Sequence, residues 1–244
     1  MDKVLERQTH ELEDAHWWYR GRRRIIDELM RGLKLGADAQ ILDAGCGSGR
    51  NMVDLARLGA VTGVEISDAG VERARVRDVG EVLQCSLTEL PIADDTFDVA
   101  VCLDVIEHIE DEQGALRELL RVVRPGGSMV VTVPAYQWLW SDHDVINHHF
   151  RRYTSRTLSK ATTAAGWRTV RVSYFNAALL PVAIPYRLLA RRSHVEGPSS
   201  DLQQMPERLN RLLEVPLRIE ARLIGSGLRV PAGLSLAAVF SKPA

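Results

Sequence analysis

The segment at residues 40–49 constrains the fold most, because an apolar strand there ends in an acidic residue and runs into three alternating glycines. The glycines are Gly45, Gly47 and Gly49. They leave the backbone open to a ligand and permit the dihedral angles of a tight strand-to-helix turn. A dinucleotide fits poorly, because its G-x-G-x-x-G fingerprint needs glycine where Arg50 stands, and Asp43 would repel a pyrophosphate. The segment predicts a nucleotide-type pocket for a ligand that carries an ammonium group, with a mere tight turn as the alternative.

A second buried strand is predicted at residues 60–66, and Glu65 at its end lies about 20 positions past the glycine turn. At this spacing a carboxylate can accept both hydroxyls of a ribose. A nearly continuous apolar run at residues 96–109 is typical of a strand that is covered on both faces. Strands alternate with helix-length segments, which predicts a parallel sheet whose ligand lies at the carboxyl ends of the strands. Four side chains are expected there: Asp43, Glu65, Ser86 and Asp104.

These motifs, in this order, resemble those of the class I S-adenosylmethionine-dependent methyltransferases, whose first motif is an acidic residue followed by x-G-x-G-x-G. The resemblance implies an α/β, Rossmann-like fold with a seven-stranded, mostly parallel sheet and an antiparallel edge hairpin. It also implies S-adenosylmethionine as the cofactor, with residues 81–90 framing the adenine and residues 104–108 beside the methionine part. The family usually has an aspartate where Ser86 stands, so a bond from Ser86 to the base would be weaker. The expected cofactor residues of the core are Asp43, Gly45, Cys46, Gly47, Glu65, Ile66, Ser86, Leu87, Leu103 and Asp104.

Ahead of the first strand, residues 16–24 combine three adjacent aromatic side chains with four arginines. A nucleic-acid surface with stacking platforms is one interpretation, but the rest of the chain supplies no extended basic surface. An amphipathic helix that buries its apolar face is the simpler interpretation. The family resemblance adds a lid function, in which this helix brings an aromatic or hydroxyl group and an arginine to the cofactor. Tyr19 and Arg23 share a helix face and are the candidates, although spacing leaves the choice of aromatic and arginine open.

The chain is expected to have four parts. Residues 1–36 form the helical lid, and residues 37–175 form the cofactor-binding core. Residues 232–244 add the last strand, which pairs with the segment ending at residue 175. The roughly 58 residues between these two edge strands exceed any turn. We therefore expect residues 176–231 to form a helical insertion that covers the active-site end and is split by a loop at residues 197–200.

Composition limits the classes of partner. The net charge of -1 gives no global attraction to nucleic acid or anionic lipid. The three cysteines show no C-x-x-C spacing, which argues against disulfides and zinc and favours a reducing cytoplasm. The start of the chain has no apolar signal core, and no apolar stretch approaches the length of a membrane span.

The segment after the fifth strand carries the candidate catalytic residues, since a histidine beside carboxylates can act as a general base. The candidates, in order, are His143, His148 and His108. The alternative is that these side chains only shape the pocket. By ligand type, a metal could bind to His143, Asp144 and His148, but no metal site is predicted, because no further ligand recurs at helical spacing. The candidate substrate residues, suited to an apolar or planar acceptor or a sugar ring, are Tyr136, Trp138, Trp140, Arg152 and Tyr153.

The sequence therefore predicts a methyltransferase that acts on a small molecule, at oxygen in preference to nitrogen. Two segments of this chain resemble unassigned bacterial members of the family, some of which look like partners of glycan or lipid-carrier pathways. An acceptor linked to a glycan or a lipid is therefore included. The alternative is a non-catalytic S-adenosylmethionine-binding subunit that docks on a membrane or on a partner enzyme. The arginine-dotted segment at residues 179–192 supports that alternative, since it could lie on a bilayer. The oligomeric state is left open.

Overall fold

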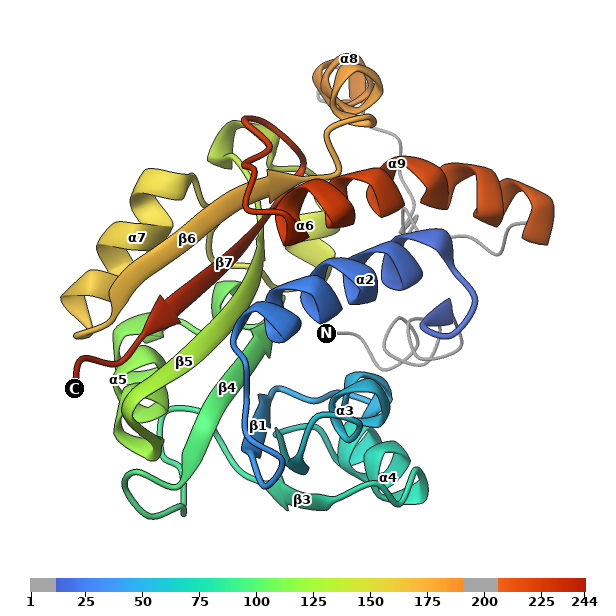
Figure 1. Cartoon of the computed structure of the whole chain (residues 1–244). Helices are drawn as coiled ribbons and strands as arrows, with labels where there is room; N and C mark the ends of the chain where they lie inside the picture. Colours follow the sequence, from blue (N-terminus) through green and yellow to red (C-terminus); the bar gives the residue numbers. More distant parts are fainter. Residues whose placement is uncertain (1–11, 191–205) are drawn as a thin grey trace.

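Seven strands form one sheet in the order β3-β2-β1-β4-β5-β7-β6 (Figure 1). The computed structural model describes residues 12–190 and 206–244, without the side chains of residues 186–190. Strands β1 to β5 are parallel, and β7 runs antiparallel to its neighbours β5 and β6. The strands are β1 (Gln40–Ala44), β2 (Ala60–Glu65), β3 (Glu81–Gln84), β4 (Phe97–Leu103), β5 (Val123–Pro134), β6 (Arg168–Phe175) and β7 (Ser235–Ser241). The predicted mostly parallel sheet with an antiparallel edge is confirmed.

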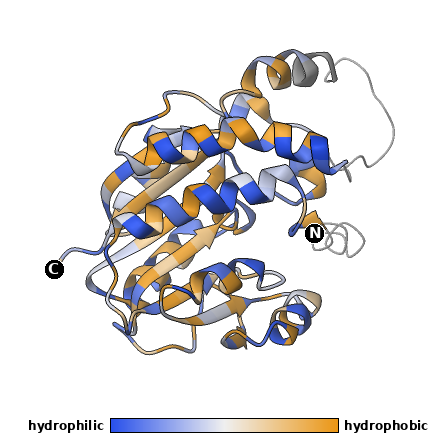
Figure 2. Cartoon of the chain, turned by 45° about the vertical axis from the view of Figure 1, so that its right-hand side comes forward, coloured by the Kyte–Doolittle hydropathy of each residue, from blue (hydrophilic) through white to orange (hydrophobic). Residues whose placement is uncertain are grey.

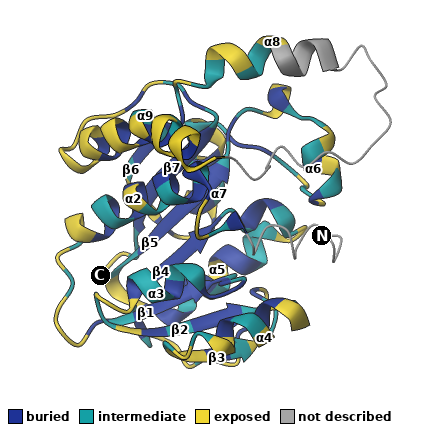
Figure 3. Ribbon diagram, turned by 90° about the vertical axis from the view of Figure 1, so that its right-hand side faces the viewer, coloured by how far each residue is buried: buried dark blue, intermediate teal, exposed yellow. Residues whose placement is uncertain are grey.

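Strand β4 shows why the apolar run in the sequence becomes the centre of the sheet. Its side chains from Val99 to Cys102 are fully buried. Such burial on both faces requires small and branched apolar residues without alternation. Figure 3 shows the result, with the strands coloured as buried and the exposed residues concentrated on helices and loops.

Helices cover both faces of the sheet and create two apolar clusters. One cluster joins the sheet to α5 and α7. The other joins the opposite face to α2, α3, α4 and α9. The helices are α2 (Trp17–Gly32), α3 (Arg50–Leu55), α4 (Asp68–Val76), η1 (Ile106–His108), α5 (Glu112–Val122), η2 (Gln137–Leu139), α6 (Asp142–Ile146), α7 (Ser155–Ala164), α8 (Leu180–Ala190) and α9 (Glu207–Gly225).

Helices α2 and α9 lie side by side across one face of the sheet, although they come from opposite ends of the chain (Figure 1). Both carry mixed hydrophilic and hydrophobic residues along their length (Figure 2). They approach closely because Gly21 has no side chain, and a Cβ atom there would collide with Leu217. The buried carboxylate of Glu214 bonds both Arg20, at 2.9 Å, and Arg24, at 2.7 Å. The pair is therefore joined by apolar contact and by charge-assisted hydrogen bonds.

Helices α8 and α9 lie within the stretch where a helical insertion is expected, between β6 and β7. Glu220 of α9 fastens this insertion to the end of β6, accepting from the backbone N–H of Asn176 at 2.5 Å and of Ala177 at 2.9 Å. The loop expected at residues 197–200 lies outside the described residues, as does the end of the segment at residues 179–192. Within the described part of the chain, no helix has both the length and the apolar character needed to cross a bilayer.

Candidate active site

The glycine turn after β1 has the geometry that the sequence predicts. Gly45, Gly47 and Gly49 all have positive φ angles, 77°, 54° and 74°. The N–H groups of Gly45 and Cys46 donate to the carbonyl of Val64 at 2.8 and 2.9 Å, which ties the turn to β2. A Cβ atom on Gly45 would lie 2.5 Å from Val105, whereas one on Gly47 would meet no atom within 4 Å. The backbone at Gly47 thus faces open space, where a ligand could approach it closely.

Asp43, just before this turn, has a carboxylate oxygen without a hydrogen-bond partner among the described residues. The residue is buried, and its Oδ2 atom has no hydrogen-bond partner among the described residues. Burial raises the pKa of Asp43 to about 7, and the guanidinium of Arg22 opposes this rise only in part. A buried carboxylate without a donor is costly. An ammonium group on a bound ligand would supply the missing partner, so the site fits the cationic end of S-adenosylmethionine.

Glu65 is held in one orientation at the end of β2. Its carboxylate accepts three backbone N–H bonds, from Gly47 at 2.9 Å, Ile66 at 2.9 Å and Ser67 at 2.8 Å. Ile66 beside it is 70% exposed, which is unusual for a large apolar side chain and suits contact with an aromatic base. Farther along, Leu87 is buried, and the Ser86 hydroxyl bonds that of Thr88 at 2.8 Å. The fit to a ribose and base is consistent, while the individual contacts stay predictions.

An arginine of α2 does reach the crevice, but it is Arg22. Its guanidinium forms an ion pair with Asp104 at the end of β4, and Thr132 donates to the same carboxylate at 3.0 Å. The guanidinium also lies over the ring of Trp18, at 4.9 Å, and over that of Tyr19, at 5.4 Å. Residues three and four apart share a helix face. Arg22 and Arg23 are therefore both compatible with the helix face of Tyr19, and spacing does not separate them.

Arg23 lies instead on the side of α3. It bonds the carbonyl of Glu13 at 2.6 Å and lies 3.5 Å from Asp54. Burial and the nearby guanidinium of Arg50 lower its pKa to about 10. Its contact with the cofactor stays a prediction that this geometry does not favour.

The turn ahead of α2, residues 12–16, covers the glycine turn. Ser48 donates its hydroxyl to Glu13, and Asp14 lies 2.6 Å from Arg50. Arg77 completes the contact by donating to the carbonyl of Ser48 at 2.8 Å. The short turn therefore packs on the glycine turn, and its role as a lid on the cofactor stays a prediction.

On the other side of Asp104, two histidine rings meet edge to face. The centroids of His108, in η1, and His149, after α6, are 4.4 Å apart. His108 Nδ1 lies 2.8 Å from the carbonyl of Asn147, and His149 Nδ1 lies 2.8 Å from Asp144 Oδ1. Burial and the neighbouring His149 lower the pKa of His108 to about 4, so this ring is neutral near pH 7. His149 was not among the predicted residues.

The other two candidate bases lie farther out. His143 is half-buried in α6, with its ring 6.1 Å from that of His149. His148 is exposed and adopts a positive φ of 56°. A catalytic role for either stays a prediction.

Arg152 and Tyr153 have internal partners. Arg152 Nε donates to Asp144 at 2.6 Å, and the Tyr153 hydroxyl donates to Glu112 at 2.6 Å. Burial raises the pKa of Asp144, but the hydrogen bonds from His149 and Arg152 outweigh burial and hold it well below its usual range. Asp144 thus locks the loop that carries His149. Substrate contact by Arg152 or Tyr153 stays a prediction, although both side chains are buried.

The predicted aromatic residues form a partly exposed group at the same edge. The ring of Tyr136 stacks on that of Tyr174, with centroids 5.1 Å apart, and tilts against that of Trp138 at 5.5 Å. Trp138 is 48% exposed, and Trp140 is half-buried. This group presents apolar surface, and its contact with an acceptor stays a prediction.

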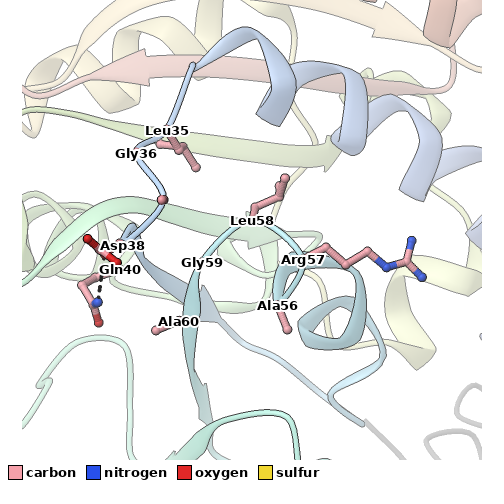
Figure 4. Close-up of a pocket in the computed structure, with 10 residues that line it drawn as sticks. Leu35, Gly36, Asp38, Gln40, Ala56, Arg57, Leu58, Gly59 and Ala60 are labelled. Carbon is pink, nitrogen blue, oxygen red and sulfur yellow. Dashed lines mark hydrogen bonds between the residues drawn. The ribbon is translucent and has the colours of Figure 1, made fainter.

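A separate pocket of about 680 Å³ is lined by residues 35–38, Gln40 and residues 56–60, and Figure 4 shows these residues. It lies where β1 and β2 begin. Ligands of parallel sheets bind at the opposite, carboxyl ends of the strands. This pocket is therefore distinct from the candidate site.

Comparison with known proteins identifies the core. A methyltransferase domain family matches residues 42–131. A protein of Mycolicibacterium smegmatis, described as a probable S-adenosylmethionine-dependent methyltransferase, is 34% identical over 133 residues, which cover 53% of this chain and 50% of the relative. The 27-O-demethylrifamycin SV methyltransferase of Amycolatopsis mediterranei is 36% identical over 117 residues, which cover 44% and 43%. The chain thus spans about half the length of these curated relatives.

The fold is also found among solved structures. A chain from the complex between the Haloferax volcanii Trm112 methyltransferase activator and its methyltransferase has a TM-score of 0.66 and 20% identity, and the match covers 99% of this chain and 95% of that one. The order of the strands, the open glycine turn, the carboxylates at the strand ends and the matched domain agree. Residues 42–131 are therefore a methyltransferase domain, and these findings support a class I S-adenosylmethionine-dependent methyltransferase with S-adenosylmethionine as its cofactor.

Proposed function

We propose that this protein transfers the methyl group of S-adenosylmethionine to a hydroxyl oxygen of a small-molecule acceptor. The observation that carries the choice of oxygen is the pair His108 and His149, next to Asp104 in the crevice. Both rings have Nδ1 engaged and Nε2 available to act on a proton or an oxygen. The relative named 27-O-demethylrifamycin SV methyltransferase also supports an oxygen acceptor.

The cofactor residues have separate roles in this proposal. Asp43 would hold the ammonium group, Glu65 the ribose hydroxyls, and Ile66 with Leu87 the adenine. Bound S-adenosylmethionine supplies an electrophilic methyl group. The remaining work of the protein is to align the acceptor for in-line displacement and to keep water out.

A hydroxyl acceptor must lose its proton as its oxygen forms the new bond to carbon. The carbon–sulfur bond breaks, and sulfur keeps the electron pair. We place the proton-accepting chemistry around His149 and His108, because both side chains are fixed by hydrogen bonds and lie past the end of β4. A small amine arriving neutral would need less help of this kind.

The acceptor should also offer apolar or planar surface. The stacked group of Tyr136, Tyr174 and the partly exposed Trp138 supports an aromatic molecule or a sugar ring. A glycan- or lipid-linked acceptor fits the same surface. We place the reaction in the reducing cytoplasm, which the three unpaired cysteines support.

The test is methyl transfer from radiolabelled S-adenosylmethionine to matched acceptors that differ only in a hydroxyl or an amine on an aromatic or sugar ring. We expect label in the hydroxyl members and formation of S-adenosylhomocysteine in equal amount. Transfer to the amines alone would replace the proposal with N-methylation. Cofactor binding without turnover on any acceptor would support the non-catalytic subunit.

A lipid-linked acceptor gains support from the outer face of α9. Five apolar side chains on this helix are well exposed: Leu209, Leu212, Val215, Ile219 and Leu223. Four exposed arginines accompany them: Arg208, Arg211, Arg218 and Arg222. Apolar and cationic residues on one surface are typical of a helix that lies on an anionic bilayer. We therefore include peripheral contact with an anionic lipid surface in the proposal.

Flotation with vesicles tests this contact. We expect the protein to float with vesicles that contain phosphatidylglycerol and to stay behind with pure phosphatidylcholine. The double variant Leu212→Ser/Ile219→Ser should lose flotation, while Leu228→Ser, an equally exposed position beyond the helix, should keep it. Equal flotation of both variants would exclude α9 as the contact.

A further inference from the structure

Three potential metal ligands meet where two distant loops join. Glu107 and His108 belong to η1, after β4, and His149 follows α6, after β5. One ligand atom from each lies within 4.8 Å of the others. The two loops are fastened here by a backbone hydrogen bond of 2.8 Å, from the N–H of Phe150 to the carbonyl of Glu107. The cluster is therefore built by the fold and not by a chance approach of mobile side chains.

The histidine rings are oriented as metal-binding rings are. A backbone carbonyl only accepts hydrogen bonds, so His108 Nδ1 must donate to Asn147, and its Nε2 atom carries the free lone pair. Asp144 likewise fixes Nδ1 of His149 as a donor and leaves Nε2 for another partner. Histidine ligands of metals usually donate their other N–H to a carbonyl or a carboxylate in this manner.

Glu107 supplies the independent observation. It is fully buried, and neither carboxylate oxygen has a hydrogen-bond partner among the described residues. Two nearby guanidinium groups are already engaged, Arg22 with Asp104 and Arg152 with Asp144. A buried carboxylate is normally paired with a charge or bound to a metal. No described side chain therefore offers Glu107 a hydrogen bond, and a bound cation would satisfy its carboxylate.

We propose that Glu107, His108 and His149 bind one divalent metal ion of the Zn²⁺ or Co²⁺ type. Two imidazoles and one carboxylate form a ligand set used by catalytic zinc sites and by other first-row transition metals. Mg²⁺ and Ca²⁺ prefer oxygen ligands throughout, so they fit this set poorly. Neither His143 nor His148 is in the set, and Asp144 contributes only through His149.

This inference rests on the proposed function and gives the hydroxyl group its activation. The set follows Asp104 at the carboxyl ends of the strands, where the acceptor is expected. An acceptor hydroxyl bound to the metal loses its proton to water more readily, since a bound cation lowers the pKa of an oxygen ligand. The resulting alkoxide attacks the methyl carbon, the carbon–sulfur bond breaks, and the electron pair stays on sulfur.

The first measurement is a titration of the metal-free full chain with Co²⁺, followed by visible absorption. We expect d–d bands that saturate at one equivalent and disappear when Zn²⁺ is added. Glu107→Gln and His149→Ala should each weaken Co²⁺ binding at least about 100-fold. His148→Ala, on an exposed side chain of the same loop, should bind Co²⁺ as the wild type does. Absence of the bands, or equal affinity of Glu107→Gln and the wild type, would overturn the metal site.

Two controls separate failure of the site from failure of folding or of the proposed function. Calorimetric binding of S-adenosylmethionine should be retained by Glu107→Gln, which shows that the variant is folded. Removal of the metal should abolish transfer to hydroxyl acceptors without loss of cofactor binding. Hydroxyl methylation that survives metal removal would overturn the role of the ion. Co²⁺ binding without hydroxyl methylation would overturn the proposed function and leave the site itself supported.

Discussion

The two halves of the crevice are built in different ways. The cofactor half consists of the glycine turn and Glu65, whose groups are joined by backbone hydrogen bonds between neighbouring parallel strands. The proposed acceptor half consists of His108 and His149. His108 bonds the carbonyl of Asn147, and His149 bonds the carboxylate of Asp144. One half depends on backbone geometry close in sequence, and the other depends on side-chain pairs between loops that follow different strands.

This difference separates binding from chemistry. A backbone cradle tolerates replacement of one side chain, because most of its donors remain in place. A side-chain cluster loses its function when one member is removed, because its members act as a unit. Changes in the acceptor half should therefore affect kcat, and changes in the cofactor half should affect affinity.

The largest effect is expected in the acceptor half. His149→Ala should lower kcat by about 10²- to 10⁴-fold with cofactor affinity retained, because it removes one Nε2 atom from the crevice. Steady-state kinetics and calorimetry measure the two quantities. Val145→Ala, at an exposed position of α6, is the matched control. Loss of activity in His143→Ala or His148→Ala, but not in His149→Ala, would return the assignment to the residues that sequence favoured.

A smaller effect is expected for Glu65→Ala. It should weaken binding of S-adenosylmethionine by about 1 to 3 kcal/mol, the range for charged hydrogen bonds left unmade. Calorimetry measures the change, and Glu81→Ala, on the exposed start of β3, serves as control. An unchanged affinity would break the assignment of Glu65 to the ribose.

The pH dependence of cofactor affinity tests Asp43. With its pKa raised to about 7, Asp43 is protonated and uncharged below that pH, so it cannot pair with an ammonium group. Affinity should fall about tenfold per pH unit below 7 and decline again above about 8, where the ligand's amino group loses its proton. Calorimetry between pH 5.5 and 8.5 measures this profile. Asp43→Asn should bind the cofactor weakly, and its affinity should not fall further below pH 7.

The pH dependence of thermal stability tests the same group. The pKa of Asp43 is higher in the folded than in the unfolded chain, so the folded state loses stability as pH rises from about 4 through 7. Asp43→Asn should therefore melt higher than the wild type at pH 8 and at a similar temperature at pH 4. A higher melting temperature of the wild type at pH 8 would contradict an unpartnered carboxylate.

The smallest effect concerns the lid. Hydrogen exchange should slow on cofactor addition across the region from residue 12 to Arg24, more at residues 12–16 than in α2, because α2 is already packed on α9. Equal exchange with and without cofactor would leave residues 12–24 as a packed support with no lid function.

The residues expected in the cofactor half could be named from the sequence because their signals are local, and their contacts with the cofactor stay predictions. Asp43, the glycines and Glu65 follow apolar strands at fixed spacing, and a parallel sheet brings their ends together. Ile66 and Leu87 follow from the same logic. The order of the strands and the antiparallel edge came from the family resemblance, since no local pattern specifies which strands pair.

The acceptor half was harder because its contacts are not local. His149 pairs with a ring 41 positions away, and no spacing rule connects them. Arg22 and Arg23 are both compatible with the helix face of Tyr19, and only the packing of α2 on the sheet separates them. Arg152 looked like a substrate contact in sequence, yet Asp144 satisfies it inside the loop. A buried carboxylate without a partner, as at Glu107, has no sequence signature.

The absent side chain of Gly21 has a consequence for how the cofactor enters. Leu217 fills the space that a side chain at Gly21 would occupy, and Glu214 bonds Arg20 and Arg24 nearby. An outward movement of α2 would expose Leu217 to water and break both ion pairs of the buried Glu214. The part that opens is then the turn at residues 12–16, while α2 stays in place. Cofactor exchange should be as fast as the movement of a surface loop, because it does not require α2 and α9 to separate.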